Sequence, residues 1–301
     1  YGRTFFAPSR VAKLLSMHDT LTTISEHACF GGVQGFYSHT SGSIGLPMHF
    51  SVFKPPQAKD GPVPAVIYLA GLTCTEETFP TKSGAQRIAA ELGLMLISPD
   101  TSPRNTGVPD ESKDWDLGAG AGFYMNATQQ PWSVHYRMED YVVNELRRIV
   151  VQQFGADVDR LGIFGHSMGG HGALTLALRY PGLFKSLSAF APICSATQCP
   201  WGTKALSHYL GADTTAWQAY DACALMASAQ TQPYPGGILI DQGLADKFLV
   251  EQLKPELFEQ ACATAKQTLT LRRHEGFDHG YYFIQTFMED HLRFHHQQLK
   301  A

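Results

Sequence analysis

Two short apolar runs constrain the fold of this chain most strongly. Residues 64–70 (PAVIYLA) and 94–98 (LMLIS) are almost wholly apolar and have the length of strands. Strands that are apolar on both sides are typical of a parallel sheet covered by helices on both faces. Between them, residues 82–92 have helical spacing and end at Gly93, a residue type that commonly follows a helix. The pattern therefore predicts a β-α-β unit and an α/β fold.

The same alternation continues along the chain without an internal repeat, which indicates one domain. An opening antiparallel pair is predicted at residues 34–39 and 48–54, and later strands at 160–164, 187–191, 237–242 and 267–273. Helices are predicted at residues 137–154, 170–179, 249–266 and 281–298. Residues 100–131 form a long loop rich in Gly, Pro, Asp and Asn, and a loop of this length in a compact domain is usually functional.

Composition excludes several classes of protein. The chain has 301 residues with 23 Lys+Arg against 27 Asp+Glu, a net charge of −4, so it lacks the basic footprint of a nucleic-acid-binding protein. It is 44% hydrophobic and 17% charged, which is too apolar for a disordered chain. No run approaches the roughly 20 apolar residues of a membrane-spanning helix. We therefore expect neither nucleic acid nor membrane as a partner.

The cysteines and the N-terminus indicate where the protein works. Six cysteines without a C-x-x-C pair favour reduced thiols in a cytoplasmic protein. Cys194 and Cys199 are spaced as two metal ligands but lack a second pair, so a metal site is the weaker interpretation. Residues 1–16 are basic, precede the first methionine at Met17 and lack the apolar core of a secretory signal. We interpret residues 1–19 as an N-terminal extension, non-native or ordered on a neighbour, and residues 20–301 as a single domain.

The most specific local signal is the sequence GHSMG at residues 165–169, which has the form G-x-S-x-G. It follows a predicted strand and opens a predicted helix, the context that a nucleophile elbow requires. Small residues at Gly165 and Gly169 let such a turn close, and the helix N-terminus favours developing negative charge beside Ser167. The alternative is a serine in a glycine-rich turn without a catalytic role, and the flanking strand and helix make it the weaker interpretation.

A serine needs a base, and in this type of site the chain order is Ser, then Asp or Glu, then His. Asp246 follows the predicted strand at 237–242, and His279 follows the last predicted strand. Both therefore belong on loops at the same sheet edge as Ser167. Asp241 competes for the acid but lies inside a strand. Asp278 is adjacent to His279 and is expected to point away from it if His279 faces the serine.

Two histidines on the terminal helix offer an alternative site. His291 and His295 are four residues apart, so a helix places them on one face, where they are expected to be solvated. Two histidines at this spacing can also ligate a metal, but no acidic partner is spaced to complete the site.

The oxyanion of an acyl-transfer reaction needs two backbone donors, one from the residue after the nucleophile and one from the loop after the third strand of this type of sheet. These positions are Met168 and Leu72, and Gly71 lets the loop approach the serine. Cys74 then lies near the mouth of the site, either as a small buried residue or as a thiol through which a thiol reagent inhibits the enzyme.

Six segments together resemble one known family, the S-formylglutathione hydrolases, also called esterase D. They are CFGG at 29–32, LTCT at 72–75, WDLGAGAGFY at 115–124, GHSMGGHG at 165–172, PWG at 200–202 and DQG at 241–243. The resemblance extends from about residue 20 to the C-terminus. It implies an α/β-hydrolase fold with a mostly parallel sheet of about eight strands and helices on both faces. The departures are residues 1–16, which have no counterpart, and Ala70, where many relatives have Ser.

The resemblance also implies a function. Members hydrolyse the thioester S-formylglutathione to formate and glutathione during formaldehyde detoxification, and they hydrolyse short acyl esters as a side activity. They are cytoplasmic, commonly homodimers, and need no cofactor or metal. The matching positions imply Ser167, Asp246 and His279 as the catalytic triad. The implied pocket residues are Cys74, Trp115, His166, Trp201 and Gln242.

Competing interpretations differ in chemistry. One is a general short-chain carboxylesterase, or an acyltransferase of the same fold that passes the acyl group to a sugar. Another is a non-catalytic binding module on a hydrolase scaffold, which the intact Ser, Asp and His in order disfavour.

Overall fold

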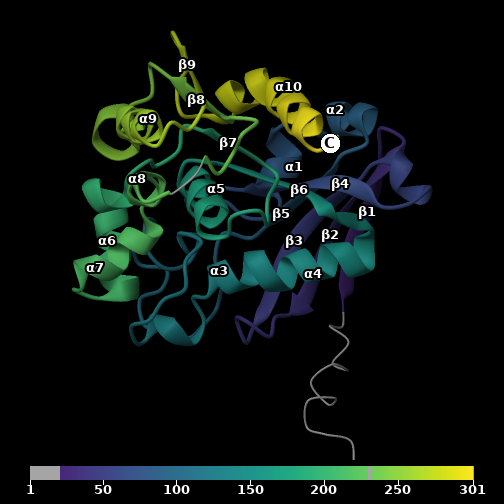
Figure 1. Ribbon diagram of the computed structural model, residues 1–301. Helices are drawn as coiled ribbons and strands as arrows, with labels where there is room; N and C mark the ends of the chain where they lie inside the picture. The colour runs from purple at the N-terminus through teal and green to yellow at the C-terminus, as the bar shows by residue number, and fades with distance from the viewer. Residues whose placement is uncertain (1–20, 230–231, 301) are drawn as a thin grey trace, which may run out of the picture.

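One nine-stranded sheet organises the described part of the chain, residues 21–229 and 232–300 of a computed structural model (Figure 1). The spatial order is β1-β2-β3-β5-β4-β6-β7-β8-β9. The strands are β1 Thr22–Cys29, β2 Gly32–Thr40, β3 Pro47–Lys54, β4 Val63–Leu69, β5 Met95–Pro99, β6 Ala156–His166, β7 Ser186–Phe190, β8 Ile238–Gly243 and β9 Leu269–His274. Pairing is antiparallel from β1 to β5 and parallel from β5 through β9. The predicted mostly parallel α/β sheet is confirmed.

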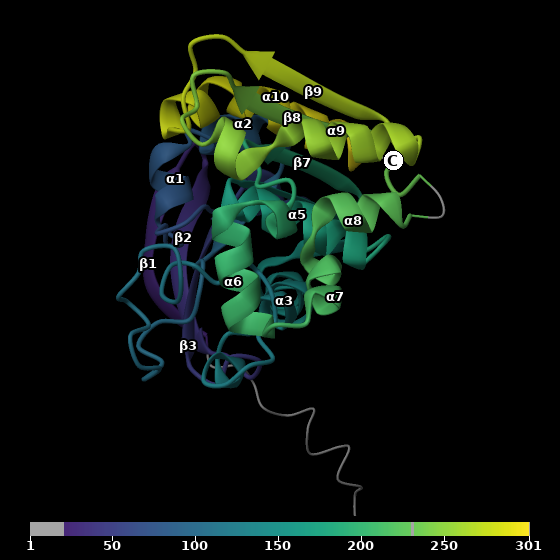
Figure 2. The same ribbon diagram turned by 90° about the vertical axis from the view of Figure 1, so that its left-hand side faces the viewer.

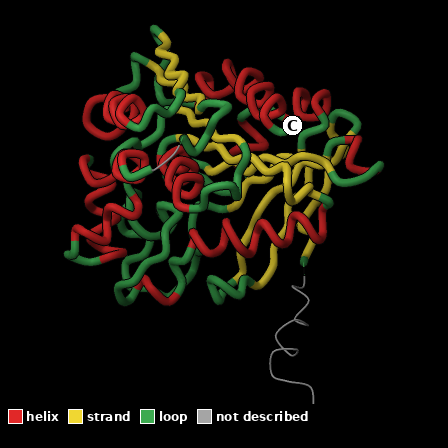
Figure 3. Tube along the Cα trace, viewed as in Figure 1, coloured by secondary structure: helices red, strands yellow, loops and turns green. Residues whose placement is uncertain are grey.

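Helices pack around this sheet, as Figures 2 and 3 show. They are α1 Thr78–Lys82, α2 Gln86–Leu92, α3 Met138–Asp140, α4 Arg147–Ile149, α5 Met168–Arg179, α6 Pro200–Leu210, α7 Thr214–Trp217, α8 Ala222–Ala227, α9 Pro255–Thr264 and α10 Tyr281–Gln298. π-helical turns at Tyr141–Leu146 and Val150–Phe154 join α3 and α4 into one segment, and a third, Leu249–Leu253, precedes α9. Short 3₁₀ turns are at Pro56–Lys59, Trp132–Val134, Ala196–Gln198 and Gln218–Tyr220.

Strand β7 shows how the two faces of the sheet are covered. Its side chains alternate, so Ser186 and Ser188 point to the face covered by α10, where both bond the His295 ring. Leu187 and Ala189 are fully buried on the face that α5 covers. Helices therefore cover both faces, and α10 and α5 lie on opposite sides of the strands in Figure 1.

The predicted elements differ from the structure at one strand and at two helices. The structure has nine strands rather than about eight because β1 is mostly exposed and shows no apolar alternation. The helix predicted at 82–92 is broken in two before α2, near Gly84 with its φ of 65°. The helix predicted at 249–266 is interrupted at Lys254, since Pro255 has no N–H to continue the ladder. The expected N-terminal extension, residues 1–19, lies outside the described residues.

The two terminal-helix histidines are buried, so the expectation of a solvated helix face is wrong. His291 and His295 have 0% exposure. The His291 Nδ1 and the His295 Nε2 each lie 2.8 Å from the Ser188 Oγ, and the His295 Nδ1 lies 2.6 Å from the Ser186 Oγ. Within the described ranges no group of three or more His, Cys, Asp or Glu is placed to hold a metal, and no helix is long and apolar enough to span a bilayer.

These buried histidines make stability depend on pH. Burial holds the pKa of His295 well below its ordinary value, with the His291 ring as a second cause, and burial also lowers the pKa of His291. The unfolded chain therefore binds more protons than the folded one below about pH 6.5, and stability is lost as pH falls through that range. We expect the free energy of unfolding to fall by up to about 1.4 kcal/mol per pH unit for each such histidine.

Urea denaturation between pH 7.5 and 5.5 measures this loss. The free energy of unfolding of the His295→Gln variant is expected to fall less steeply with acid than that of the parent chain. The His208→Gln variant, which changes an exposed histidine, should show the same pH dependence as the parent. Equal slopes in all three proteins would contradict the assignment to His295.

Candidate active site

Ser167 occupies a sharp turn between β6 and α5. Its φ of 58° and ψ of −119° lie in a region that side chains rarely adopt, and such strain is concentrated at functional sites. A Cβ on Gly165 would lie 2.2 Å from the Gly169 carbonyl oxygen, and one on Gly169 would lie 1.9 Å from the Leu69 carbonyl oxygen. Only glycine fits at these two positions. The local sequence therefore forms the strained turn that exposes a serine at the sheet edge.

His279 and Asp246 meet at the same edge from two different loops. Asp246 follows β8 and His279 follows β9, and the His279 Nδ1 lies 2.5 Å from the Asp246 Oδ2. The buried carboxylate is held by the Phe248 amide at 2.8 Å and by the Gln242 side-chain amide at 3.4 Å. Because Nδ1 is bonded to the carboxylate, Nε2 is the ring nitrogen available to a nucleophile or substrate.

Ser167 and His279 line one small pocket of ≈130 Å³. The other lining residues are Gly71, Leu72, Cys74, Trp115, His166, Trp201, Phe248 and Tyr281. Most of the pocket residues implied by the sequence are therefore brought together. Gln242 is the exception: it does not line the pocket, because its side chain points at Asp246 and at the Gly243 carbonyl.

The two rival acids are held elsewhere. Asp241 is fully buried and receives hydrogen bonds from the Arg272 guanidinium, at 2.6 Å from its Nε. Burial alone would raise the pKa of Asp241, but hydrogen bonds from His291 and Arg272 lower it below its ordinary value. Asp278 accepts a hydrogen bond from the Gly280 amide at 2.8 Å. Asp241 thus anchors β9 and α10, and Asp278 shapes the turn after His279.

The loop after β4 approaches the serine closely. A Cβ on Gly71 would lie 3.3 Å from the Ser167 Cβ, so this position too is restricted. The Thr73 amide donates to the Gly120 carbonyl at 2.9 Å, which ties this loop to the long loop before α3. Leu72 therefore lines the pocket together with Ser167, and Met168 begins α5 directly after Ser167.

Aromatic rings form the pocket wall. Trp201 packs against Trp115 with ring centroids 5.4 Å apart and against Phe248 at 4.7 Å. Phe248 in turn contacts His279 at 5.1 Å, and His166 lies at 4.4 Å on the same ring. Burial, and secondarily His279, hold the pKa of His166 well below its ordinary value. His166 is therefore neutral at pH 7 and does not carry a charge that would repel a protonated His279.

Helix α6 fixes the position of Trp115. The Lys204 Nζ lies 2.8 Å from the Asp114 Oδ2 and 2.6 Å from the Asp116 Oδ1, so it bridges the residues on either side of Trp115. One turn earlier on α6, Trp201 packs on the Trp115 ring. Sequence reasoning missed this clamp, as it missed Phe248 and Tyr281 in the pocket, because contacts between distant segments leave no local pattern.

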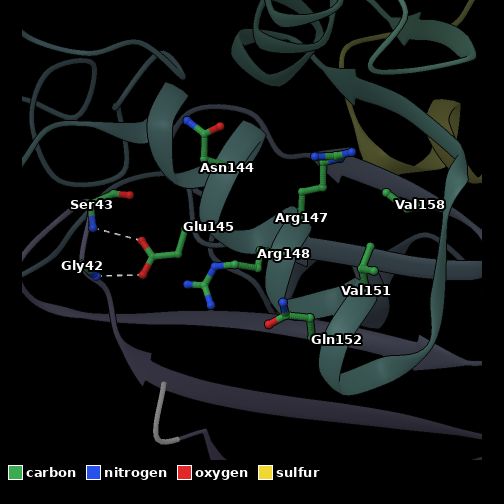
Figure 4. Close-up of a pocket in the computed structure, with 9 residues that line it drawn as sticks. All are labelled: Gly42, Ser43, Asn144, Glu145, Arg147, Arg148, Val151, Gln152 and Val158. Atoms are coloured by element: carbon green, nitrogen blue, oxygen red, sulfur yellow. Dashed lines mark hydrogen bonds between the residues drawn. The ribbon is translucent and has the colours of Figure 1, made fainter. Parts of the chain in front are cut away.

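A larger cavity of ≈520 Å³ lies at the opposite end of β6 (Figure 4). It is lined by Gly42, Ser43, Asn144, Glu145, Arg147, Arg148, Val151, Gln152 and Val158. The Glu145 carboxylate accepts hydrogen bonds from the Gly42 and Ser43 amides and so joins the turn between β2 and β3 to the helical segment. Val158 and Ser167 are nine residues apart on an extended strand, about 30 Å. This cavity is therefore separate from the serine site.

Comparisons with known proteins identify relatives across almost the whole chain. A family model described as "putative esterase" matches residues 41–294. The chain is 50% identical over 285 residues to the S-formylglutathione hydrolase of Mus musculus and 49% identical to that of Rattus norvegicus, covering 93% of this chain and 99% of each relative. The structure of an S-formylglutathione hydrolase from Agrobacterium tumefaciens matches with a TM-score of 0.89 and 51% identity, covering 92% of this chain and 99% of that one.

The thiol in the pocket generates a prediction. Burial raises the pKa of Cys74, so its reactive thiolate is scarce at neutral pH. We expect iodoacetamide to inactivate the enzyme slowly at pH 7 and markedly faster above pH 9, as measured by residual esterase activity. Cys74→Ser should remove this sensitivity, and Cys29→Ser, at a half-buried thiol on β1, should retain it. Undiminished inactivation of the Cys74→Ser enzyme would exclude Cys74 as the target.

Proposed function

The chain belongs to the esterase family and, within it, to the S-formylglutathione hydrolases, and on this premise we propose how its site performs the reaction. The protein is a serine hydrolase that cleaves the thioester S-formylglutathione to formate and glutathione and also hydrolyses short acyl esters. The observation that carries the proposal is the small pocket shared by Ser167 and His279, with the His279 Nδ1 2.5 Å from Asp246. Ser167, His279 and Asp246 are its proposed catalytic triad.

In the first half of the proposed reaction, Ser167 attacks the formyl carbon while the His279 Nε2 takes the hydroxyl proton. Asp246 stabilises the imidazolium that forms and keeps the ring oriented. The carbonyl oxygen becomes an oxyanion, for which the backbone amides of Leu72 and Met168 are the proposed donors. When the C–S bond breaks, the glutathione sulfur leaves and takes the proton from His279.

In the second half, water enters the site and replaces Ser167 as the nucleophile, and the Ser167 Oγ becomes the leaving group. His279 accepts a proton from the water molecule as the water oxygen attacks the formyl carbon. His279 then donates this proton to the Ser167 Oγ as the ester bond breaks. Formate is released and the serine is regenerated. Every proton is exchanged through His279, so the proposed chemistry is complete with the residues of the chain.

The pocket fits the small acyl group. A formyl group has one carbon, and the cavity of ≈130 Å³ is closed by large rings, including those of Trp201 and Phe248. The half-exposed Trp115 lies at its rim. A tripeptide attached through sulfur can therefore extend outwards while the formyl carbon reaches Ser167.

The cellular setting is proposed from the family. We propose that the enzyme serves formaldehyde detoxification in the cytoplasm and works as a homodimer. Edge strand β1 supports a dimer contact, since Ile24 on it and Phe30 in the following turn are 53% and 58% exposed. Light scattering should give twice the chain mass, and Phe30→Asp should lower it if this edge is the contact.

The triad generates the first kinetic prediction. Ser167→Ala is expected to lower kcat/KM for S-formylglutathione by about 10⁴-fold or more, and Asp246→Asn by about 10²- to 10⁴-fold. Asp278→Asn is the matched control, since this carboxylate lies beside His279 but bonds the Gly280 amide, and it should change the rate less than about threefold. Full activity in the Ser167→Ala enzyme with a native circular dichroism spectrum would refute the proposed mechanism.

The small volume of the pocket generates the second kinetic prediction. Along the series p-nitrophenyl acetate, butyrate and octanoate, we expect kcat/KM to fall about ten- to hundredfold, because the added methylenes collide with the aromatic wall. The Trp201→Ala variant should show a smaller decrease in kcat/KM from acetate to octanoate. Trp217→Ala, which truncates a ring bonded to the Gly211 carbonyl away from the pocket, should leave it steep. A preference of the parent enzyme for octanoate would contradict the assignment.

A further inference from the structure

Four rings follow one another along one wall of the active-site pocket. The ring centroids of Tyr281 and His166 are 6.2 Å apart, those of His166 and His279 are 4.4 Å apart, and those of His279 and Phe248 are 5.1 Å apart. All four residues line the pocket. The series therefore runs across the site with the proposed catalytic base in its interior and Tyr281 and Phe248 at its two ends.

A lysine ammonium lies over the ring at each end. The Lys82 Nζ, at the end of α1, is 5.7 Å from the Tyr281 ring centroid, and the Lys247 Nζ is 4.9 Å from the Phe248 ring centroid. Both lysines are exposed. The charge of Lys82 also acts on the Cys74 thiol inside the pocket, where it partly opposes the rise in pKa that burial causes.

No carboxylate in the described part of the chain neutralises either of these two charges. In the described part of the chain, neither ammonium lies within ion-pair distance of a carboxylate. Lys204 provides the contrast, because it is also close to the pocket wall but is neutralised by Asp114 and Asp116. Lys82 and Lys247 are therefore exposed cations beside two rings that line the pocket, and a ligand that extends out of the pocket can use them.

The proposed substrate carries one carboxylate on each side of its sulfur-bearing residue. Glutathione has its sulfur on the central residue, the α-carboxylate of γ-glutamate at one end and the glycine carboxylate at the other. In an extended chain the glycine carboxylate lies about 5–6 Å from the central Cα. A thioester carbonyl placed at Ser167 thus directs one carboxylate to each side of the mouth.

From this match we propose that Lys82 and Lys247 form two carboxylate subsites that bind the opposite ends of the glutathionyl group and select it over neutral thioesters and esters. The inference rests on the proposed function for its substrate, but binding can be measured without turnover. Both proposed lysine–carboxylate pairs would lie at the surface. Single ion pairs there contribute only modestly to the free energy of binding and are screened by salt.

The decisive experiment measures inhibition of p-nitrophenyl acetate hydrolysis by S-methylglutathione, a ligand with both carboxylates and no cleavable acyl group. We expect Lys82→Met and Lys247→Met each to raise the inhibition constant about three- to fivefold and the double variant to raise it about tenfold or more. The KM and kcat for p-nitrophenyl acetate should stay within about twofold. Lys185→Met, an exposed lysine at the opposite sheet edge just before β7, is the control and should change neither quantity.

Esterified ligands test the pairing itself. The S-methylglutathione dimethyl ester keeps only the positive charge of its α-ammonium group, so it should bind the parent weakly and should not bind the double variant more weakly. The monoester at glycine should be insensitive to one of the two lysine substitutions and sensitive to the other. Raising ionic strength from about 0.05 to 0.5 M should weaken S-methylglutathione binding to the parent enzyme more than to the double variant.

The proposal is overturned if the double variant changes the inhibition constant by less than about 1.5-fold, which is about the precision of the assay. It is also overturned if the dimethyl ester inhibits as well as the free acid, or if only one of the two lysine substitutions has an effect. Failure of the proposed function is a different result, namely no turnover of S-formylglutathione by the parent enzyme. In that case the inhibition measurements still decide whether the two subsites exist.

Discussion

The strained backbone at Ser167 is the constraint on which the rest of the site depends. A serine with φ of 58° is tolerated because β4, β6 and α5 approach so closely that Gly165 and Gly169 have no room for a Cβ beside the neighbouring carbonyls. That approach exists only while β6 stays paired between β4 and β7 in the centre of the sheet. The sheet core therefore supports the strain that exposes Ser167.

Buried polar contacts hold the other elements of the candidate site in place relative to this turn. Asp241 on β8 bonds Arg272 on β9 and His291 on α10, so one carboxylate joins the elements that flank the His279 loop. Burial of these charges is tolerated because each has partners. On the opposite wall, Lys204 holds the long loop through two aspartates. The pocket is thus assembled from separate loops, each anchored to a helix or a strand.

Elements that depend on neighbouring residues can be predicted from the sequence, whereas elements that depend on distant segments cannot. The terminal helix Tyr281–Gln298 was predicted at its observed bounds because its spacing and the preceding glycine are local signals. The motif at 165–169 predicted its turn for the same reason. Strand β1 and helices α6 to α8 were missed, since exposed or short elements have weak local patterns and are stabilised by contacts with distant segments. His291 and His295 were placed in solvent because helical spacing indicates a common face but not which neighbour covers it.

The sequence by itself determined the parallel α/β sheet, the serine turn and the chain order of Ser167, Asp246 and His279, because each depends on local residue preferences or on the ends of predictable strands. Only the tertiary structure decided that Gln242 bonds Asp246 rather than lining the pocket, and that Phe248 and Tyr281 line it, each with a lysine ammonium over its ring. These facts depend on side chains from segments far apart in the sequence, and their packing is set by the three-dimensional fold rather than by neighbouring residues.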